Sequence, residues 1–209
     1  LICASYINKV IKDFIRTWVY DRRREFHKTE SPSMDILISS NLERLVFELA
    51  GRDPGQVLEW MNQLVKDGIY RIPSIPLDQL QSLFYGGCAD QNETSRAIKN
   101  AFETHSYLLD PHSAVGFHVL QKYREETGDS RPVALASTAS PFKFNRGVLE
   151  ALGRETLNRD EFSLLEDLSL VSGQPVPRKL AELQSLPEIH REVCERQDMA
   201  KVLFRFLGI

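Results

Sequence analysis

The chain has 209 residues, of which 42% are hydrophobic and 26% charged, and its formal net charge is −3. This composition is ordinary for a globular protein, and the small negative charge gives no reason to expect nucleic acid or an anionic membrane as partner. No apolar run approaches the ~20 residues that span a bilayer, so we expect no membrane helix. The three cysteines lie far apart, which favours reduced thiols and a cytoplasmic location over a disulfide framework.

The chain opens on a strand and a helix. Residues 1–5 form a compact apolar run that predicts a buried strand, and Asn8 is then placed to cap a helix. A strand followed by a helix is the unit of a parallel α/β sheet. Because Leu1 is not a methionine and the strand begins without a lead-in, we expect the chain to be part of something longer. The basic run 22–24 predicts a solvated surface rather than a phosphate site.

Helix signals recur in the next segments. Asn41 is expected to cap one helix, and Asp53 followed by a proline predicts the start of another that ends at Gly68. A short helix is expected over residues 77–84. The paired glycines 86 and 87 predict a turn before a helix that spans about 91–105, because they lack the lysine and hydroxyl of a phosphate loop.

A second segment of interest is an Asp-Pro-His-Ser sequence at residues 110–113. It predicts a helix start that Asp110 caps, with small residues that let a ligand or another backbone approach closely. One interpretation makes Asp110 and Ser113 simple caps and leaves His112 in water. The other makes Asp110 and His112 part of a ligand site, and the residues alone leave this open.

The stretch 133–144 organises the chain. An apolar run over residues 133–136 predicts a short buried strand, and Ser137 and Thr138 stand at its carboxyl end. Ligands of open α/β sheets lie beyond the carboxyl ends of strands, where two hydroxyls can meet a ring nitrogen or a phosphate without adding charge. The sequence therefore predicts a ligand site near Ser137 and Thr138.

Beyond residue 144 the pattern becomes helical, with helices expected at about 146–152, 159–171, 178–186 and 197–206. We therefore expect a sheet-containing part over residues 1–144 and a helical segment over residues 145–209. Cys88, His105 and His112 lack the spacing of a zinc site, so no metal is expected. No serine has the flanking glycines of a nucleophile elbow.

Three segments resemble threonine synthase, a pyridoxal-phosphate enzyme of fold type II. They are SPSMDILISSNLER at residues 31–44, LDPHSAVG at 109–116 and ASTASPFKF at 136–144. The opening segment with Asn8 resembles the family too, so the similarity runs nearly end to end. The resemblance implies an α/β fold, part of a fold type II enzyme with parallel strands and a helical C-terminal tail.

The resemblance also implies a reaction, in which O-phosphohomoserine and water give threonine and phosphate. The cofactor, pyridoxal 5'-phosphate, serves as the electron sink. By the resemblance, Thr138 lies against the pyridine nitrogen with Ser137 beside it, and a neutral hydroxyl there leaves that nitrogen largely unprotonated. Asp110, His112 and Asn8 become candidates for the wall of the substrate pocket.

Several positions depart from the family. Tyr6, Lys9, Lys12 and Trp18 stand where smaller, amide or hydroxyl residues are expected, and Ser113 replaces the usual threonine. The lysine that binds the cofactor and the phosphate loop lie upstream in the family, and no lysine here matches, Lys143 included.

We therefore expect the C-terminal part of a threonine synthase, inactive by itself. The alternatives are a threonine-synthase-like protein with altered or no synthase activity, and a stand-alone binding module.

Overall fold

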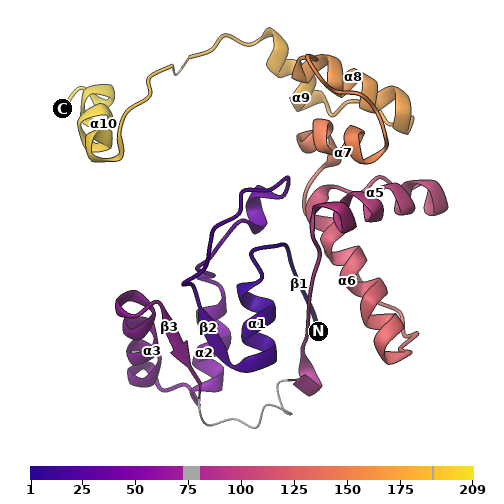
Figure 1. Ribbon diagram of the computed structural model, residues 1–209. Helices are drawn as coiled ribbons and strands as arrows, with labels where there is room; N and C mark the ends of the chain where they lie inside the picture. The colour runs from indigo at the N-terminus through magenta and orange to yellow at the C-terminus, as the bar shows by residue number, and fades with distance from the viewer. Residues whose placement is uncertain (73–80, 190) are drawn as a thin grey trace. The chain divides into compact units, whose positions relative to one another are not determined.

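The computed structural model describes residues 1–72, 81–189 and 191–209 (Figure 1). Contacts between residues divide the chain into two compact units, Leu1–Pro175 and Val176–Ile209. The first contains every strand of the described chain, and the second contains short helices only. The division at 144 and 145 that the sequence suggests concerns where strands give way to helices, and it stays a prediction.

A parallel strand pair lies at the centre of the first unit. β1 (Ile2–Ser5) pairs in parallel with β4 (Tyr85–Cys88), with Ile2 opposite Tyr85 and Ser5 opposite Cys88. α1 (Val10–Thr17) packs on one face of this pair and α6 (Pro111–Thr127) on the other (Figure 1). The strand and helix expected at the start of the chain are confirmed, and with them the α/β class.

The two glycines of β4 explain how both helices come so close. A Cβ on Gly86 would lie 3.1 Å from the Lys12 carbonyl oxygen in α1, and one on Gly87 would lie 2.4 Å from Val119 Cγ1 in α6. The prediction of a turn at these glycines was wrong. They are strand residues whose missing side chains let a helix pack on each face of the sheet.

A second, antiparallel pair carries the largest apolar core. β2 (Val19–Asp21) pairs with β3 (Ile69–Arg71), and α1, α2 (Leu42–Leu49) and α3 (Pro54–Lys66) pack around them. Aromatic rings fill the space between: Phe14, Trp18, Tyr20, Trp60 and Tyr70. The rings of Tyr20 and Tyr70 stack with centroids 5.4 Å apart, and burial raises the pKa of both phenols.

The cap predictions had mixed outcomes. Asp53 caps α3 by accepting hydrogen bonds from the N–H groups of Gly55 and Gln56, as expected for an aspartate that stands directly before a proline. Asn41 stands at the N-cap of α2, but its side chain makes no capping bond. Asn8 was wrongly predicted as the cap of α1, because Lys9 occupies that position and the Asn8 amide is bound to a distant loop.

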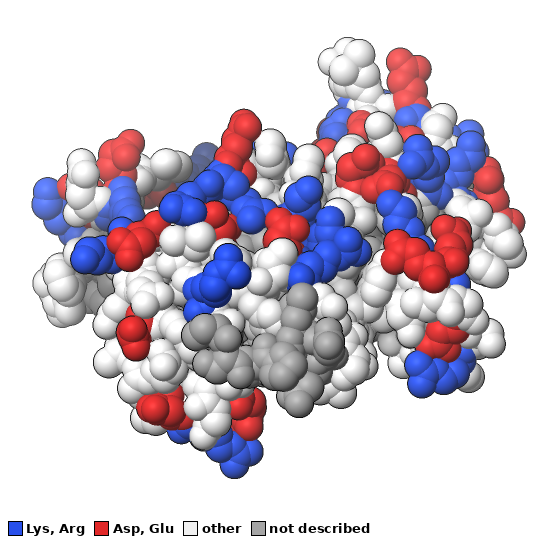
Figure 2. Space-filling model, turned by 60° about the horizontal axis from the view of Figure 1, so that its bottom comes forward, with Lys and Arg blue, Asp and Glu red and all other residues white. Residues whose placement is uncertain are grey.

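The arginine side chains of the basic run 22–24 bind nearby carbonyl and carboxylate groups of the same unit. Arg22 donates to the carbonyl oxygens of Leu64 and Val65 in the last turns of α3, where helix carbonyls lack partners. Arg23 pairs with Asp21 at 3.0 Å and Arg24 with Asp13 at 2.7 Å. Acidic and basic side chains are interspersed over the face that Figure 2 presents.

The rest of the first unit is helical. α5 (Gln91–His105) begins at a capping box formed by Asp90 and Glu93, and it packs against α6. α7 (Asn145–Ala151) packs on α5 and α8 (Glu161–Ser172). Two single turns, Pro32–Met34 and Pro141–Phe144, precede α2 and α7.

The second unit contains α9 (Arg178–Glu182), α10 (Met199–Leu207) and the short turns Leu183–Ser185 and Arg196–Asp198. The four helices expected after residue 144 are confirmed in place, with α9 shorter than expected. Of the helix expected over 77–84, residues 77–80 lie outside the described residues, and residues 81–83 are helical. No helix in the described part of the chain has the length and apolar content needed to cross a bilayer.

The strand expected over residues 133–136 is corrected. This segment has no regular secondary structure, and the side chains of Val133 and Leu135 are 43% and 36% exposed. A strand is defined by hydrogen bonds to a neighbour, and in the described residues both strand pairs form without this segment. The apolar pattern is genuine, but no strand of the described residues pairs with this segment.

Candidate active site around the start of helix α6

The start of α6 is fixed by Asp110. Its side chain is fully buried, and its Oδ1 accepts hydrogen bonds from the N–H groups of His112 and Ser113 at 2.9 and 3.2 Å. Pro111 occupies the first helical position, where its missing N–H costs nothing. The carboxylate is therefore committed to the helix end, which confirms the capping role that the sequence predicts.

Ser113 joins this cap to the segment that carries the predicted ligand residues. Its hydroxyl donates to Asp110 Oδ2 and lies 2.8 Å from the Ser137 hydroxyl. A serine hydroxyl has one proton, so Ser137 is the donor to Ser113. This relay runs from a buried carboxylate through two hydroxyls, and it holds residue 137 against the helix start.

His112 lies in the same place. Its Nδ1 is 3.2 Å from Asp110 Oδ1 without the alignment of a hydrogen bond, and its ring packs against Phe144 at 4.8 Å between centroids. The side chain is 15% exposed, and both ring nitrogens are buried without a hydrogen-bond partner among the described groups. The interpretation that leaves His112 in water is therefore wrong.

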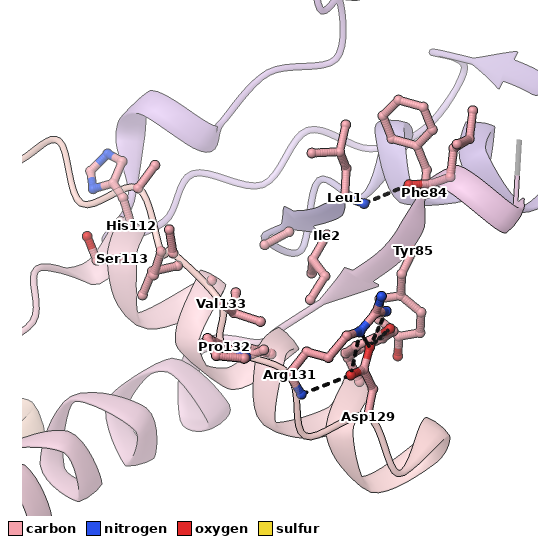
Figure 3. A pocket seen from close by; sticks show the side chains of 18 of the residues that line it. Leu1, Ile2, Phe84, Tyr85, His112, Ser113, Asp129, Arg131, Pro132 and Val133 are labelled. Carbon is pink, nitrogen blue, oxygen red and sulfur yellow. Dashed lines mark hydrogen bonds and ion pairs between the residues drawn. The ribbon is translucent and has the colours of Figure 1, made fainter.

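An open cavity of about 830 Å³ lies beside these residues (Figure 3). Its walls come from β1, from the chain just before β4, from one side of α6 and from residues 131–136. His112 and Ser113 lie at one end and Asp129 and Arg131 at the other (Figure 3). Thr138 also lines this cavity, and because Ser137 is bound to Ser113, Thr138 belongs to the end with the histidine.

The far end of the cavity is polar but internally paired. Arg131 binds Asp129 at 2.6 Å, and this guanidinium, together with the Tyr123 hydroxyl, holds the pKa of Asp129 below its ordinary value. Tyr85 donates to Glu126 at 2.8 Å, and burial followed by this bond raises the pKa of Tyr85 to about 12. These groups are already bound to one another, and the hydroxyl of Thr138 belongs to the other end of the cavity.

Asn8 is buried elsewhere. Its amide donates to the His27 carbonyl oxygen at 2.6 Å and to Asp35 Oδ1 at 3.2 Å, and its own oxygen accepts from the His27 N–H. Asp35 in turn binds Thr29. Asn8 is absent from the residues that line the cavity with Thr138, so its contacts fix the loop before α2, and a role toward substrate stays a prediction.

Two of the four departures from the family pattern are core residues. Tyr6 is 1% exposed, packs with Ala89 and Val115, and donates to Gln91. Trp18 ends α1 in the left-handed region with φ 60° and packs edge-on against Phe14. Lys9, by contrast, is exposed and Lys12 half-buried. The two large aromatic residues are thus accommodated by packing.

Sequence reasoning missed two contacts of the site. The spacing of Ser113 from Asp110 signals a cap, but nothing local signals its bond to Ser137, which lies 24 residues further on. The packing of Phe144 on His112 is likewise a contact between distant segments. Within the described residues, no group of three or more His, Cys, Asp or Glu side chains is placed to hold a metal ion.

Comparison with known proteins identifies sequences and structures that are similar to this chain. Residues 113–203 match the family described as threonine synthase, C-terminal. The chain is 35% identical over 196 residues to threonine synthase-like 1 of Macaca fascicularis, which covers 93% of this chain and 24% of that protein. It is 32% identical over 172 residues to the threonine synthase of Corynebacterium glutamicum, covering 80% of this chain and 35% of that one.

Solved structures agree with the sequence matches. The pyridoxal-phosphate-bound threonine synthase of Brucella melitensis superposes on 99% of this chain with a TM-score of 0.78 and 31% identity. Yeast threonine synthase gives a TM-score of 0.80 at 28% identity. The chain spans 39% and 41% of those two structures and about a quarter of the threonine synthase-like 1 proteins. Over nearly its whole length the chain is similar to threonine synthases, and it spans only a part of their length.

Proposed function

We propose that these residues form the cofactor-facing C-terminal part of a threonine synthase, which converts O-phosphohomoserine and water to threonine and phosphate. The observation that carries this proposal is the relay from Asp110 through Ser113 to Ser137, because it holds Thr138 at the end of the open cavity where His112 lies. Relatives named threonine synthase, one of them solved with pyridoxal phosphate, supply the reaction and the cofactor.

The donor set at this end of the cavity fits such a cofactor. Thr138 offers a neutral hydroxyl, whereas the hydroxyl of Ser113 and the carboxylate of Asp110 are already bound in the relay and at the helix start. A hydroxyl can donate to an unprotonated ring nitrogen without supplying the charge that would protonate it. When bound, pyridoxal phosphate supplies an electron sink for carbanions formed during elimination of phosphate and addition of water.

The residues of this chain then have defined roles. Thr138 would hold the pyridine nitrogen, and Ser137, tied to Ser113, would keep Thr138 in place. His112 and Asp110 would form the adjacent pocket wall, with the ring of Phe144 fixing the imidazole. The lysine that binds the cofactor and the groups that bind its phosphate would come from outside these 209 residues. Asn8 would contribute to substrate binding only together with those groups.

A second candidate is a threonine-synthase-like protein that binds the cofactor or phosphorylated amino acids with altered or no synthase activity. The relatives with 34% to 36% identity over most of this chain are named threonine synthase-like 1, whereas those named threonine synthase reach 31% or 32%. Tyr6 and Lys12, which stand where smaller, amide or hydroxyl residues are expected in the family, motivate this alternative.

Turnover separates the two candidates. The whole protein that contains these residues is incubated with pyridoxal phosphate and O-phosphohomoserine, and both threonine and phosphate are measured. Equal amounts of both, at a rate within about 1–10³ per second, support the synthase. Binding of the cofactor or of O-phosphohomoserine without threonine formation supports the second candidate, and a protein that binds neither contradicts both. A cytoplasmic location is proposed with the synthase.

A further inference from the structure

The segment that carries Thr138 runs back along α6 toward the start of that helix. The chain leaves α6 at Gly128, which adopts the left-handed region with φ 70°. Positions along the helix then meet positions along the segment in the pairs Tyr123–Asp129, Gly116–Leu135 and Ser113–Ser137. The segment is therefore held on α6 at both of its ends, and residues 132–136, which line the cavity, lie between them.

Asp129 organises the end that lies far from Thr138. Its Oδ2 accepts a hydrogen bond from the Tyr123 hydroxyl at 2.7 Å, and its Oδ1 accepts one from the backbone N–H of Arg131 at 3.0 Å. The Arg131 guanidinium binds both carboxylate oxygens, with Nε 2.9 Å from Oδ1 and Nη2 2.6 Å from Oδ2 (Figure 3). One carboxylate thus joins the helix, the backbone and a charged side chain.

The backbone of residue 131 is held from both sides. Its N–H donates to Asp129, and its carbonyl oxygen accepts from the Arg124 guanidinium at 3.1 Å. Arg124 and Tyr123 both lie near the end of α6, so each side of this residue is connected to the helix. The chain is therefore fixed immediately before it becomes the wall of the cavity.

The two ends of the segment constrain it differently. The single hydrogen bond between Ser137 and Ser113 fixes one point but leaves open the direction of the chain through that point. Residues 132–136 have no regular secondary structure that would set this direction. Pro132 directly follows the fixed residue 131, and its ring holds φ near about −65°, so the direction set at residue 131 is carried into the wall.

Four residues at this end are here called the far anchor: Tyr123, Arg124, Asp129 and Arg131. We propose that the far anchor positions Thr138, with Asp129 as the residue that sets the path of the segment along α6. Asp129 lies at the opposite end of the cavity from Thr138, so it acts through the segment rather than by contact with a ligand there. Its effect on the cofactor rests on the proposed function, whereas its ordering of residues 132–138 does not.

Removal of a single hydroxyl tests the far anchor. Tyr123→Phe keeps the ring that packs edge-on against Tyr85, with centroids 5.0 Å apart, and removes the hydroxyl bound to Asp129. Tyr85→Phe is the matched control, because it removes a hydroxyl from the other ring of the same pair, and that hydroxyl is bound to Glu126 instead. Both variants are made in the whole protein that contains these residues.

Hydrogen exchange without cofactor measures the ordering of the segment. Tyr123→Phe is expected to speed amide exchange of residues 133–138 at least about fivefold, whereas Tyr85→Phe is expected to leave exchange there unchanged. Equal exchange of these amides in the two variants would overturn the role of the far anchor, whatever the protein binds.

Cofactor binding then shows whether the far anchor acts through Thr138. Tyr123→Phe is expected to weaken pyridoxal phosphate binding about threefold to tenfold, and adding it to Thr138→Val is expected to cause no further loss. Two losses that multiply would overturn positioning through Thr138, because independent sites contribute additively to the free energy of binding. A parent protein that binds no pyridoxal phosphate would contradict the proposed function, and hydrogen exchange would still decide whether the far anchor orders the segment.

Discussion

Residues 10–72 and residues 129–138 belong to the same compact unit and differ in how they are completed. The first region closes on itself, with Phe14, Tyr20 and Tyr70 packed in one aromatic core. The second extends beside an open sheet edge with half-exposed apolar side chains, and it is attached to α6 through Asp129, Leu135 and Ser137. Apolar sequence therefore yields buried structure only where the chain itself supplies the partner.

The largest expected difference between the two regions comes from truncating an apolar side chain in each. Phe14→Ala removes a fully buried ring that contacts three other aromatic residues, and it is expected to lower the free energy of unfolding by about 3–5 kcal/mol. Leu135→Ala is expected to cost less than about 1 kcal/mol, since Leu135 is 36% exposed. Urea unfolding measures both, and equal losses would remove the distinction.

Two glycines at the α6 interface differ in what an added side chain would meet. Gly87→Ala places a Cβ 2.4 Å from the fully buried Val119, so overpacking is expected to cost about 1–3 kcal/mol. Gly116→Ala meets only the end of the Leu135 side chain, which can move, and is the matched control. Adding Val119→Ala to Gly87→Ala is expected to cost less than the sum of the single losses. Strict additivity in chemical denaturation would argue against the close contact.

A third substitution addresses the link between the helix start and the open segment. Ser113→Ala leaves Ser137 without its acceptor and Asp110 Oδ2 without its donor, so the free energy of unfolding is expected to fall by about 1–2 kcal/mol. Ser113→Thr keeps the hydroxyl and is expected to stay within about 0.5 kcal/mol of the parent. Thermal melting measures the difference, and an alanine variant as stable as the threonine variant would show that the relay does not contribute to the free energy of unfolding.

The smallest expected effect is a pH dependence in the helix layer that supports both regions. Burial lowers the pKa of His118, and although burial opposes it, the hydrogen bond from Lys122 holds the pKa of Glu93 low. Both pKa values lie below their unfolded values, so the unfolded chain binds more protons and stability falls as pH drops below about 6.5 and again below about 4.5. His118→Gln is expected to flatten the first decline in melting temperature between about pH 7 and 5.5. An unchanged profile would mean that His118 titrates alike in both states.

Local signals in the sequence predicted much of the fold. Caps at Asp53 and Asp110 are formed with residues two or three positions away, so their helices could be placed from the sequence alone. The strand over residues 133–136 failed because a strand depends on a neighbour that lies elsewhere. The turn predicted at Gly86 and Gly87 was wrong because the lack of a side chain there is required by two helices that are distant in sequence.

The candidate site was predictable in part. The composition around Thr138 and the spacing of Asp110 pointed to this region, and the structure brings Ser137 and His112 to the same helix start. The bond between Ser113 and Ser137 could not be predicted, because it joins segments 24 residues apart. Asn8 was assigned from resemblance, and its observed partners, His27 and Asp35, belong to a loop whose folding no local pattern reveals.

If Thr138 faces the cofactor, its hydroxyl contributes to the dissociation constant of pyridoxal phosphate in the whole protein that contains these residues. Thr138→Val keeps the shape of the side chain and removes its hydroxyl, and we expect at least tenfold weaker binding with a shifted cofactor absorption band. Leu157→Ala, at a residue that is 74% exposed and does not line the cavity, is expected to bind like the parent. A Thr138→Val protein with the parent's dissociation constant and spectrum would show that Thr138 does not face the cofactor.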